Sequence, residues 1–386
     1  MSAVPIDELP PAELPPEPWL DVPLTWVGTA LDRVAMSGLR LALSAALALD
    51  PRKLDEVLCS GAPYVTDELA ADPRRFFAFL DEPPARVVER VAGRRRMAGG
   101  AIVLREFVTR YVPYHATGAW RACAENERVR VEHWMHRSGR SRATVLTLHG
   151  FGMGQGWVDA HVLMAMHWFT LGLDVALLTL PFHGPRAPRT SRYSGELFGS
   201  WDVGCLNESV RQAVHDVHLV TRWLVRRTGT RVGLLGWSLG GYIAALCAGL
   251  MPELAFVVSM LSPVCLGALP SRLLRLEDLK ASDPSSFSLE RLRRAYRVHC
   301  PLTYPLALPR EHALIVGGRG DLIVPPEHVH RLWLHWGKPA IHWFSGSHSV
   351  PFRRGHIAER IGAHFRALGL AGSGTAVKPV ALRRSA

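Results

Sequence analysis

Short apolar stretches alternate with longer amphipathic stretches from about residue 140 to residue 370. The apolar stretches have the length of buried strands, and the stretches between them have the spacing of helices that cover a sheet. This alternation predicts a parallel sheet with helices on both faces. The expected strands are 144–148, 174–180, 231–236, 255–261, 313–317 and 340–344, and the expected helices are 157–171, 206–228, 239–251, 326–336 and 355–368.

Two further strands are expected ahead of this region. Residues 101–112 have a strand-like composition, and residues 128–136 alternate polar and apolar side chains as a half-buried strand does. A turn signal, Ser138-Gly139-Arg140, comes next. We therefore expect these strands to form an antiparallel edge of the sheet.

Residues 1–100 are expected to form an extension ahead of the main domain. Residues 1–24 contain seven prolines and five acidic residues, a composition typical of an extended and poorly ordered leader. Residues 66–98 look helical, with an interruption at Pro83-Pro84. The extension is therefore predicted to be helical beyond its leader.

An apolar helix is predicted at residues 25–49, where Asp32, Arg33 and Arg40 interrupt the apolar pattern. One interpretation is a helix that lies on a membrane surface, with Trp26 at its start. The other is a helix that packs on the main domain or lies over its pocket. The thin polar face, which is not rich in basic side chains, favours the packing interpretation.

The main domain is expected to span residues 101–370. Within it, residues 262–310 join two strands where one helix would be enough, and long insertions of this kind often form lids or binding loops. We interpret this segment as a lid-like insertion. A second long loop occupies residues 181–205. Residues 371–386 are rich in small side chains and are expected to form a flexible tail.

Composition narrows the classes of protein that fit this pattern. The chain has 386 residues, of which 48% are hydrophobic, and it has no uncharged apolar run of roughly 18 residues that would cross a membrane. The basic residues behind the formal net charge of +11 are nearly all arginines spread along the chain. Without a nucleic-acid-binding motif, this charge indicates a solvated surface and no nucleic-acid partner. Six cysteines without C-x-x-C or zinc-like spacing favour a cytoplasmic location.

The strongest chemical signal is Gly236-Trp237-Ser238-Leu239-Gly240, which follows an apolar strand and opens a helix-like stretch. This is the context of a G-x-S-x-G nucleophile elbow, in which a sharp turn holds a serine hydroxyl above the sheet. Glycines are needed on either side because the turn leaves no room for a Cβ atom. The start of the next helix offers free N–H groups to a developing oxyanion. Ser238 is therefore the candidate nucleophile.

A serine nucleophile needs a base and a group that orients the base. Asp321 follows the expected strand 313–317 in a glycine-rich loop, and His348 follows the expected strand 340–344. Because the carboxyl ends of parallel strands meet at one edge of a sheet, both side chains should face the edge that carries Ser238. Taken alone, Asp321 could cap a helix and His348 could be a structural histidine. The three together predict a Ser-His-Asp triad.

A glycine-rich turn, H-G-F-G at residues 149–152, follows another of the expected strands. Such a turn can aim a backbone N–H group at the oxygen of a reacting carbonyl. We expect an oxyanion hole formed by the N–H of Phe151, with Gly152 as the alternative, and the N–H of Leu239. The ring of His149 is expected to fix the turn.

The chain resembles the α/β-hydrolase superfamily at the turn 149–152, the motif 236–240, Asp321 and His348. The resemblance covers about residues 101–370. The resemblance implies the α/β-hydrolase fold, a mostly parallel eight-stranded sheet flanked by helices, here with a helical N-terminal extension and the lid-like insertion. It assigns the nucleophile to Ser238, the acid to Asp321 and the base to His348. Residues 180–186 and 236–241 also look like the branch typified by α/β-hydrolase domain-containing protein 18.

The function implied by this resemblance is that of a serine hydrolase. It would cleave a carboxylic ester or thioester of a small-molecule acyl substrate through an acyl-enzyme, with lipids among the candidate substrates. The mechanism needs no metal and no organic cofactor, and the histidines show no H-E-x-x-H spacing. The alternatives are an acyltransferase or peptidase on the same fold, or a lipid- or partner-binding module without activity.

Substrate contacts are expected from one charged and several aromatic side chains. Arg186 lies with Arg189 and Arg192 on the loop 181–205, where arginines could pair with an anionic substrate or could simply belong to the surface. Aromatic residues near the motifs could line an apolar acyl pocket or pack in the core. The aromatic candidates are Trp157, Trp237, Trp201 and Phe151, and the substrate-binding residues predicted are Trp237, Trp157 and Arg186.

Overall fold

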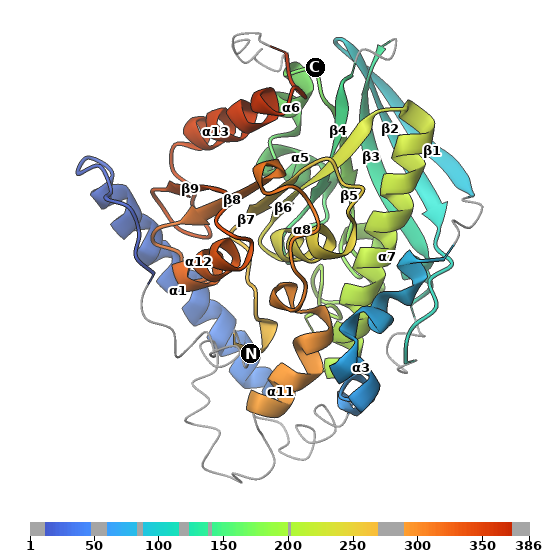
Figure 1. Cartoon of the computed structure of the whole chain (residues 1–386), viewed down its shortest axis with the longest axis vertical. Coiled ribbons are helices and arrows are strands. Elements are labelled where there is room, and N and C mark those ends of the chain that lie inside the picture. Colours follow the sequence, from blue (N-terminus) through green and yellow to red (C-terminus); the bar gives the residue numbers. More distant parts are fainter. Residues whose placement is uncertain are drawn as a thin grey trace.

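A mixed sheet of nine strands forms the centre of the molecule (Figure 1). The strands β4 to β9 pair with one another in parallel. The strands β1, β2 and β3 pair antiparallel, and β3 also pairs antiparallel with β5. In spatial order the strands are β1 (Glu89–Met97), β2 (Gly100–Val108), β3 (Arg128–His136), β5 (Asp174–Leu178), β4 (Ala143–Leu148), β6 (Arg231–Trp237), β7 (Val257–Met260), β8 (Ala313–Gly318) and β9 (Ala340–Phe344). This computed structural model describes residues 12–47, 60–82, 88–115, 123–137, 141–199, 202–268 and 289–372.

Helices cover both faces of the sheet and enclose one apolar core on each face. Every residue of β4, β5, β7 and β8 is buried, which explains why these strands appear in the sequence as continuous apolar runs. The predicted fold class is therefore confirmed. One face carries α7 (Val203–Thr228), α8 (Leu239–Leu250) and α12 (Pro326–His335), and the other carries α5 (Gly156–Val162), α6 (Ala165–Thr170) and α13 (Arg354–Ala367).

The N-terminal edge of the sheet differs from the prediction. The sequence predicts helix over residues 66–98. In the described part of this range, the helical segments are α3 (Asp67–Ala71) and the 3-10 segment η3 (Pro73–Leu80), and β1 is a strand. No residue of β1 is buried, so the strand lacks the alternation of apolar side chains that would reveal it, and its pairing with β2 decides its conformation. The sheet therefore has nine strands rather than eight and begins before residue 101.

Buried polar contacts attach the extension to α7. Glu208 of α7 is fully buried and accepts hydrogen bonds from the hydroxyl of Tyr64 in the extension (2.8 Å) and from that of Tyr111 in the main domain. Arg211 of the same helix donates from Nε to the carbonyl of Phe76 (2.6 Å). Because buried polar groups need partners, these contacts fix the extension on the body of the molecule.

Helix α1 (Val22–Leu47) lies near the ends of β8 and β9 (Figure 1). The Thr29 hydroxyl donates to the carbonyl of Gly320 after β8, and the N–H of Gly346 after β9 donates to the Thr25 hydroxyl. The helix expected at residues 25–49 is therefore present, and it packs on the main domain. None of the helices in the described ranges has an apolar stretch long enough to cross a bilayer.

The described part of the lid-like insertion includes α11 (Leu289–Tyr296), which packs on the start of α7. Leu292 and Tyr296 form a small buried cluster there with Val203. Several predicted features lie partly or wholly outside the described residues. These parts are 1–11 of the leader, 48–49 of the expected helix 25–49, 83–87 of the expected helix 66–98, the turn 138–140, residues 200–201 with the aromatic candidate Trp201, 269–288 of the insertion and 373–386 of the tail.

Candidate active site

Ser238 lies at the sharp turn between β6 and α8. Its backbone has φ 54° and ψ −113°, a conformation that a non-glycine residue adopts only where its surroundings enforce it. The Ser238 N–H donates to the carbonyl of Met260 in β7 (2.8 Å), and its carbonyl accepts from the N–H of Tyr242 in α8 (2.9 Å). The turn is thus held by the neighbouring strand and by its own helix.

Glycines allow this turn to close. A Cβ atom on Gly236 would clash with the carbonyl of Gly240, and a Cβ atom on Gly240 would clash with the carbonyl of Leu148. The second close approach places the elbow directly against the glycine-rich turn 149–152 that follows β4. The two motifs found separately in the sequence therefore lie in contact.

The three side chains of the predicted triad meet at the carboxyl edge of the sheet. His348 Nε2 lies 2.8 Å from Ser238 Oγ, and His348 Nδ1 lies 2.7 Å from Asp321 Oδ2. Asp321 Oδ1 accepts a hydrogen bond from the N–H of Val324 (2.7 Å). The side chain of Asp321 is 1% exposed and that of His348 is 11% exposed. A continuous hydrogen-bonded chain therefore leads from a serine hydroxyl to a buried carboxylate.

The charges around His348 favour a basic imidazole. Burial by itself would lower the pKa of His348, but the carboxylates of Asp321 and Asp32 outweigh burial and raise this pKa above its ordinary value. Burial raises the pKa of Asp321, against the opposing effect of His348. With Nδ1 donating to Asp321, Nε2 can accept the proton of Ser238.

Two backbone N–H groups are available beside the nucleophile. Leu239 is the first residue of α8, and the first N–H groups of a helix have no acceptor within it. Phe151 lies on the turn that contacts the elbow, where a Cβ atom on Gly150 would be 3.6 Å from Ser238 Cβ. In the part of the chain that the structure describes, no hydrogen bond occupies the N–H of Phe151 or of Leu239.

His149 fixes the turn, as the sequence predicts. Its Nε2 accepts a hydrogen bond from the N–H of Leu180 (3.0 Å), and Nδ1 donates to the carbonyl of Gly150 (2.8 Å). Complete burial lowers the pKa of His149 to about 4. A neutral ring in this single tautomer therefore links the turn to the chain after β5.

The prediction that Arg186 contacts the substrate is wrong. Its side chain is fully buried and forms an ion pair with Asp216 of α7 (2.8 Å). The guanidinium also donates to the carbonyls of Thr179 (2.8 Å) and Asn126 (3.0 Å). A buried charge needs such partners, so Arg186 holds its loop against α7 and has no free face for a substrate.

The two tryptophans predicted to contact the substrate lie in different environments. Trp237 is 9% exposed and belongs to the apolar core on the α13 face, with its ring against Gly150. Trp157 on α5 is 78% exposed. Neither ring lines an apolar pocket for an acyl group, because the ring of Trp237 belongs to the core and that of Trp157 is open to solvent. Phe151 is 44% exposed, and its ring meets those of His183 and Tyr193 edge-on.

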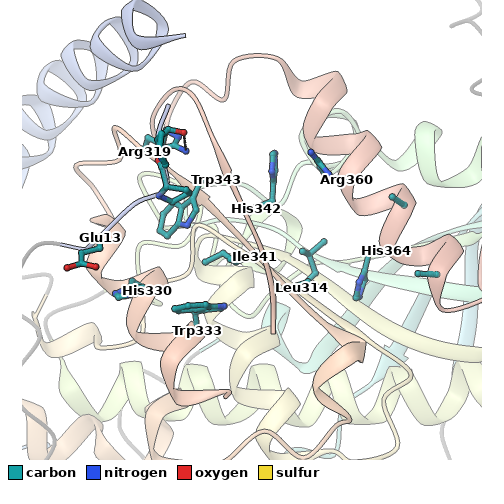
Figure 2. Close-up of a pocket in the computed structure, with 15 residues that line it drawn as sticks. Glu13, Leu314, Arg319, His330, Trp333, Ile341, His342, Trp343, Arg360 and His364 are labelled. Carbon is teal, nitrogen blue, oxygen red and sulfur yellow. Dashed lines mark hydrogen bonds between the residues drawn. The ribbon is translucent and has the colours of Figure 1, made fainter. Parts of the chain in front are cut away.

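A cavity of about 830 Å³ lies at the β9 edge of the sheet (Figure 2). Figure 2 shows Trp333 of α12 on one side, Arg360 and His364 of α13 on the other, and His342 of β9 between them. None of the three triad residues lines this cavity. It is therefore separate from the site around Ser238.

One residue at the site is not predicted from the sequence, where Asp32 only interrupts an apolar pattern. In the structure its carboxylate is fully buried and accepts a hydrogen bond from the N–H of His348 (3.1 Å). The available signal was that Asp32 is the one acidic residue in the sequence of the expected helix 25–49. Its partner lies more than 300 positions away, so the sequence pattern alone could not identify it.

Comparisons of sequence give two relatives, and no family model matches the chain. The chain is 32% identical over 237 residues to the uncharacterized proteins MT2702 and Rv2627c, which come from two strains of Mycobacterium tuberculosis. Each match covers 61% of this chain and 56% of the relative. The chain thus spans about half the length of the curated relatives it matches.

Comparisons of structure identify the fold. Acetyl xylan esterase 1 from a Thermoanaerobacterium species is similar with a TM-score of 0.55 and 14% identity, over 84% of this chain and 99% of that one. An acetyl xylan esterase from a Paenibacillus species has a TM-score of 0.57 and 12% identity, over 82% and 99% of the two chains. With the mostly parallel sheet and the strand–turn–helix elbow, this likeness shows that the chain has the α/β-hydrolase fold.

Proposed function

We propose that the protein is a serine hydrolase of the α/β-hydrolase superfamily that cleaves carboxylic esters or thioesters. The observation that carries the proposal is the hydrogen-bonded chain from Ser238 through His348 to Asp321, which begins at a strained turn. Two proteins of the same fold are named acetyl xylan esterases, and this supports ester chemistry.

In the first half of the reaction, Ser238 Oγ attacks the acyl carbon while His348 Nε2 takes the hydroxyl proton. The carbonyl π electrons move onto oxygen, where the N–H groups of Phe151 and Leu239 would donate to the oxyanion. Each such donor is worth about 3–4 kcal/mol of transition-state stabilisation. Asp321 stabilises the imidazolium that forms and keeps the ring in the required orientation.

In the second half, His348 returns its proton to the leaving alkoxide or thiolate as the bond to the acyl carbon breaks. The acyl group then remains on Ser238 as an ester. His348 next deprotonates a water molecule, which attacks this ester and releases the carboxylic acid. Ser238 regains its proton, and no metal or organic cofactor takes part in either half.

Two observations favour two different ester substrates. The names of the two acetyl xylan esterases favour a short acyl group, and the exposed apolar face of α1 near the catalytic loops favours a lipid ester. The motif residues 180–186 and 236–241 remain the basis for proposing the branch typified by α/β-hydrolase domain-containing protein 18. The free thiols of Cys123, Cys247 and Cys300 support the proposed cytoplasmic location.

The proposal is tested with p-nitrophenyl esters of increasing acyl length, an anilide of the same acid, and an added alcohol acceptor. We expect ester hydrolysis that releases the free acid and falls on the order of 10⁴-fold or more in Ser238→Ala. Faster cleavage of the anilide would support a peptidase, and transfer of the acyl group to the alcohol would support an acyltransferase. Equal rates for the native chain and Ser238→Ala would contradict serine catalysis and favour a binding module.

A further inference from the structure

One face of α1 contacts both loops that carry the acid and the base. We call these the acid loop, residues 319–324, and the histidine loop, residues 345–350. The side chains at this face recur with helical spacing, so they lie in one stripe along α1. The residues of the stripe are Thr25, Gly28, Thr29 and Asp32.

Asp32 joins the two loops through four hydrogen bonds. Asp32 Oδ2 accepts from the N–H of Leu322 in the acid loop (3.0 Å) and from the N–H of His348 (3.1 Å). Asp32 Oδ1 accepts from the Ser347 hydroxyl (2.9 Å) and from the N–H of Ser349 (3.0 Å). One carboxylate from the N-terminal extension therefore holds the residue that follows Asp321 and the backbone of the base itself.

These hydrogen bonds require a fixed arrangement of the loops. A fully buried carboxylate is costly unless several donors satisfy it, and hydrogen bonds to a charged acceptor are roughly twice as strong as neutral ones. Three of the four donors to Asp32 are backbone N–H groups, so a shift of either loop would remove them. The charge of Asp32 also acts on His348, together with that of Asp321.

The helix lies too close to both loops to admit larger side chains. A Cβ atom on Gly28 would be 2.8 Å from the backbone nitrogen of Ser347. On the acid loop, a Cβ atom on Gly320 would clash with the hydroxyl of Thr29. Asp32 can therefore reach the loop backbones directly, because glycine on each side allows the close approach.

Other contacts hold the same segment without contacting the acid or the base. Asp21, just before α1, forms an ion pair with Arg353 (2.5 Å). Arg319 donates to the carbonyl of Pro15 (2.7 Å). Arg319 also lines the cavity shown in Figure 2. The segment is thus attached at points that do not depend on Asp32.

We propose that Asp32 is a positioning residue of the active site, which holds the loops bearing Asp321 and His348 in the arrangement needed for reaction. This inference rests on the proposed serine hydrolase function. It gives α1, a helix outside the sheet, a direct part in aligning the base. Asp32 acts through His348 and does not contact the substrate.

The test compares Asp32→Asn with the matched control Asp21→Asn in the full chain, using p-nitrophenyl acetate. An amide at position 32 presents an NH₂ group to two donors and removes the charge. We expect kcat to fall on the order of 10²-fold while KM changes less than about twofold, because the loops shift but the substrate contacts remain. Asp21→Asn, on the same segment, should keep the native kcat.

The pH profile separates positioning from a general loss of stability. The groups that act on His348 are Asp321 from the acid loop, Asp32 from α1 and the hydroxyl of Ser238 from the elbow. Removing the charge at position 32 lowers the pKa of His348, so the acid limb of kcat/KM should move to lower pH. A variant that is merely less stable would keep the native limb.

Two further measurements complete the test. If Asp32→Asn does not fold, Ser347→Ala removes only one donor and should lower kcat severalfold at constant KM. If the native chain shows no hydrolysis, the proposed function fails, and NMR titration of the His348 ring still tests the inference. Native kcat, KM and pH profile in Asp32→Asn, or an unchanged ring pKa, would overturn it.

Discussion

In the proposed mechanism, the protonation of His348 sets the rate at low pH, because only the neutral ring can accept the proton of Ser238. The carboxylates of Asp321 and Asp32 raise the pKa of His348 despite its burial. We therefore predict that kcat/KM falls as the pH drops through a pKa above the usual histidine value of about 6.5. A pH–rate profile with a small ester measures this limb, and a limb at or below the usual value would contradict the prediction.

The same side chains show which roles a sequence can reveal. Ser238 is recognisable because its strained backbone requires glycine at positions 236 and 240, which the chain displays as a motif. Arg186 is not, because its role depends on Asp216, which comes from α7 and carries no motif of its own. A sequence shows that an arginine is present, and only the fold shows whether its charge faces a substrate or a buried carboxylate.

At the scale of elements, α1 has two faces with different partners. The face with Asp32 is hydrogen-bonded to the acid loop and the histidine loop. The opposite face is open to solvent and carries a stripe of exposed apolar side chains, with Trp26 72% exposed and Val34 71% exposed. The sequence pattern predicts this helix correctly, yet it cannot tell which polar residue on it will be buried.

The membrane contact expected for residues 25–49 stays a prediction. The solvent-exposed face of α1 is the surface that would make this contact. A tryptophan-bearing apolar stripe on a chain of net charge +11 matches an anionic lipid surface. We expect Trp26→Ser combined with Val34→Ser to reduce co-sedimentation with vesicles that contain an anionic phospholipid. Hydrolysis of a small ester should stay at the native rate, because these side chains point away from the loops.

A matched control for this experiment is Val225→Ser combined with Leu334→Ser, which replaces exposed apolar side chains on α7 and α12. The control should sediment like the native chain. Deleting residues 1–50 would be a poorer test, because it would also remove the hydrogen bonds of Asp32 to the acid and histidine loops. Equal co-sedimentation of the native chain and the α1 variant would refute the membrane contact.

At the scale of the whole molecule, the sequence predicts the parallel half of the sheet better than its antiparallel edge. Strands such as 144–148 and 313–317 are buried on both faces, so nearly all their side chains are apolar and the sequence reveals them. The exposed strand β1 has no such signature and is decided by its partner β2. The three residues of the candidate triad follow three parallel strands. Because the carboxyl ends of these strands lie at one edge of the sheet, the sequence could predict that residues far apart in the chain meet there.

A fluorophosphonate probe reacts with activated serines and therefore tests the proposed nucleophile Ser238. The native chain should be labelled on Ser238, labelling should disappear in Ser238→Ala, and its rate should fall on the order of 10⁴-fold or more in His348→Ala. Melting temperatures of the variants show that each is folded. If the folded native chain does not react, or if it reacts equally well without His348, Ser238 is not a nucleophile activated by His348.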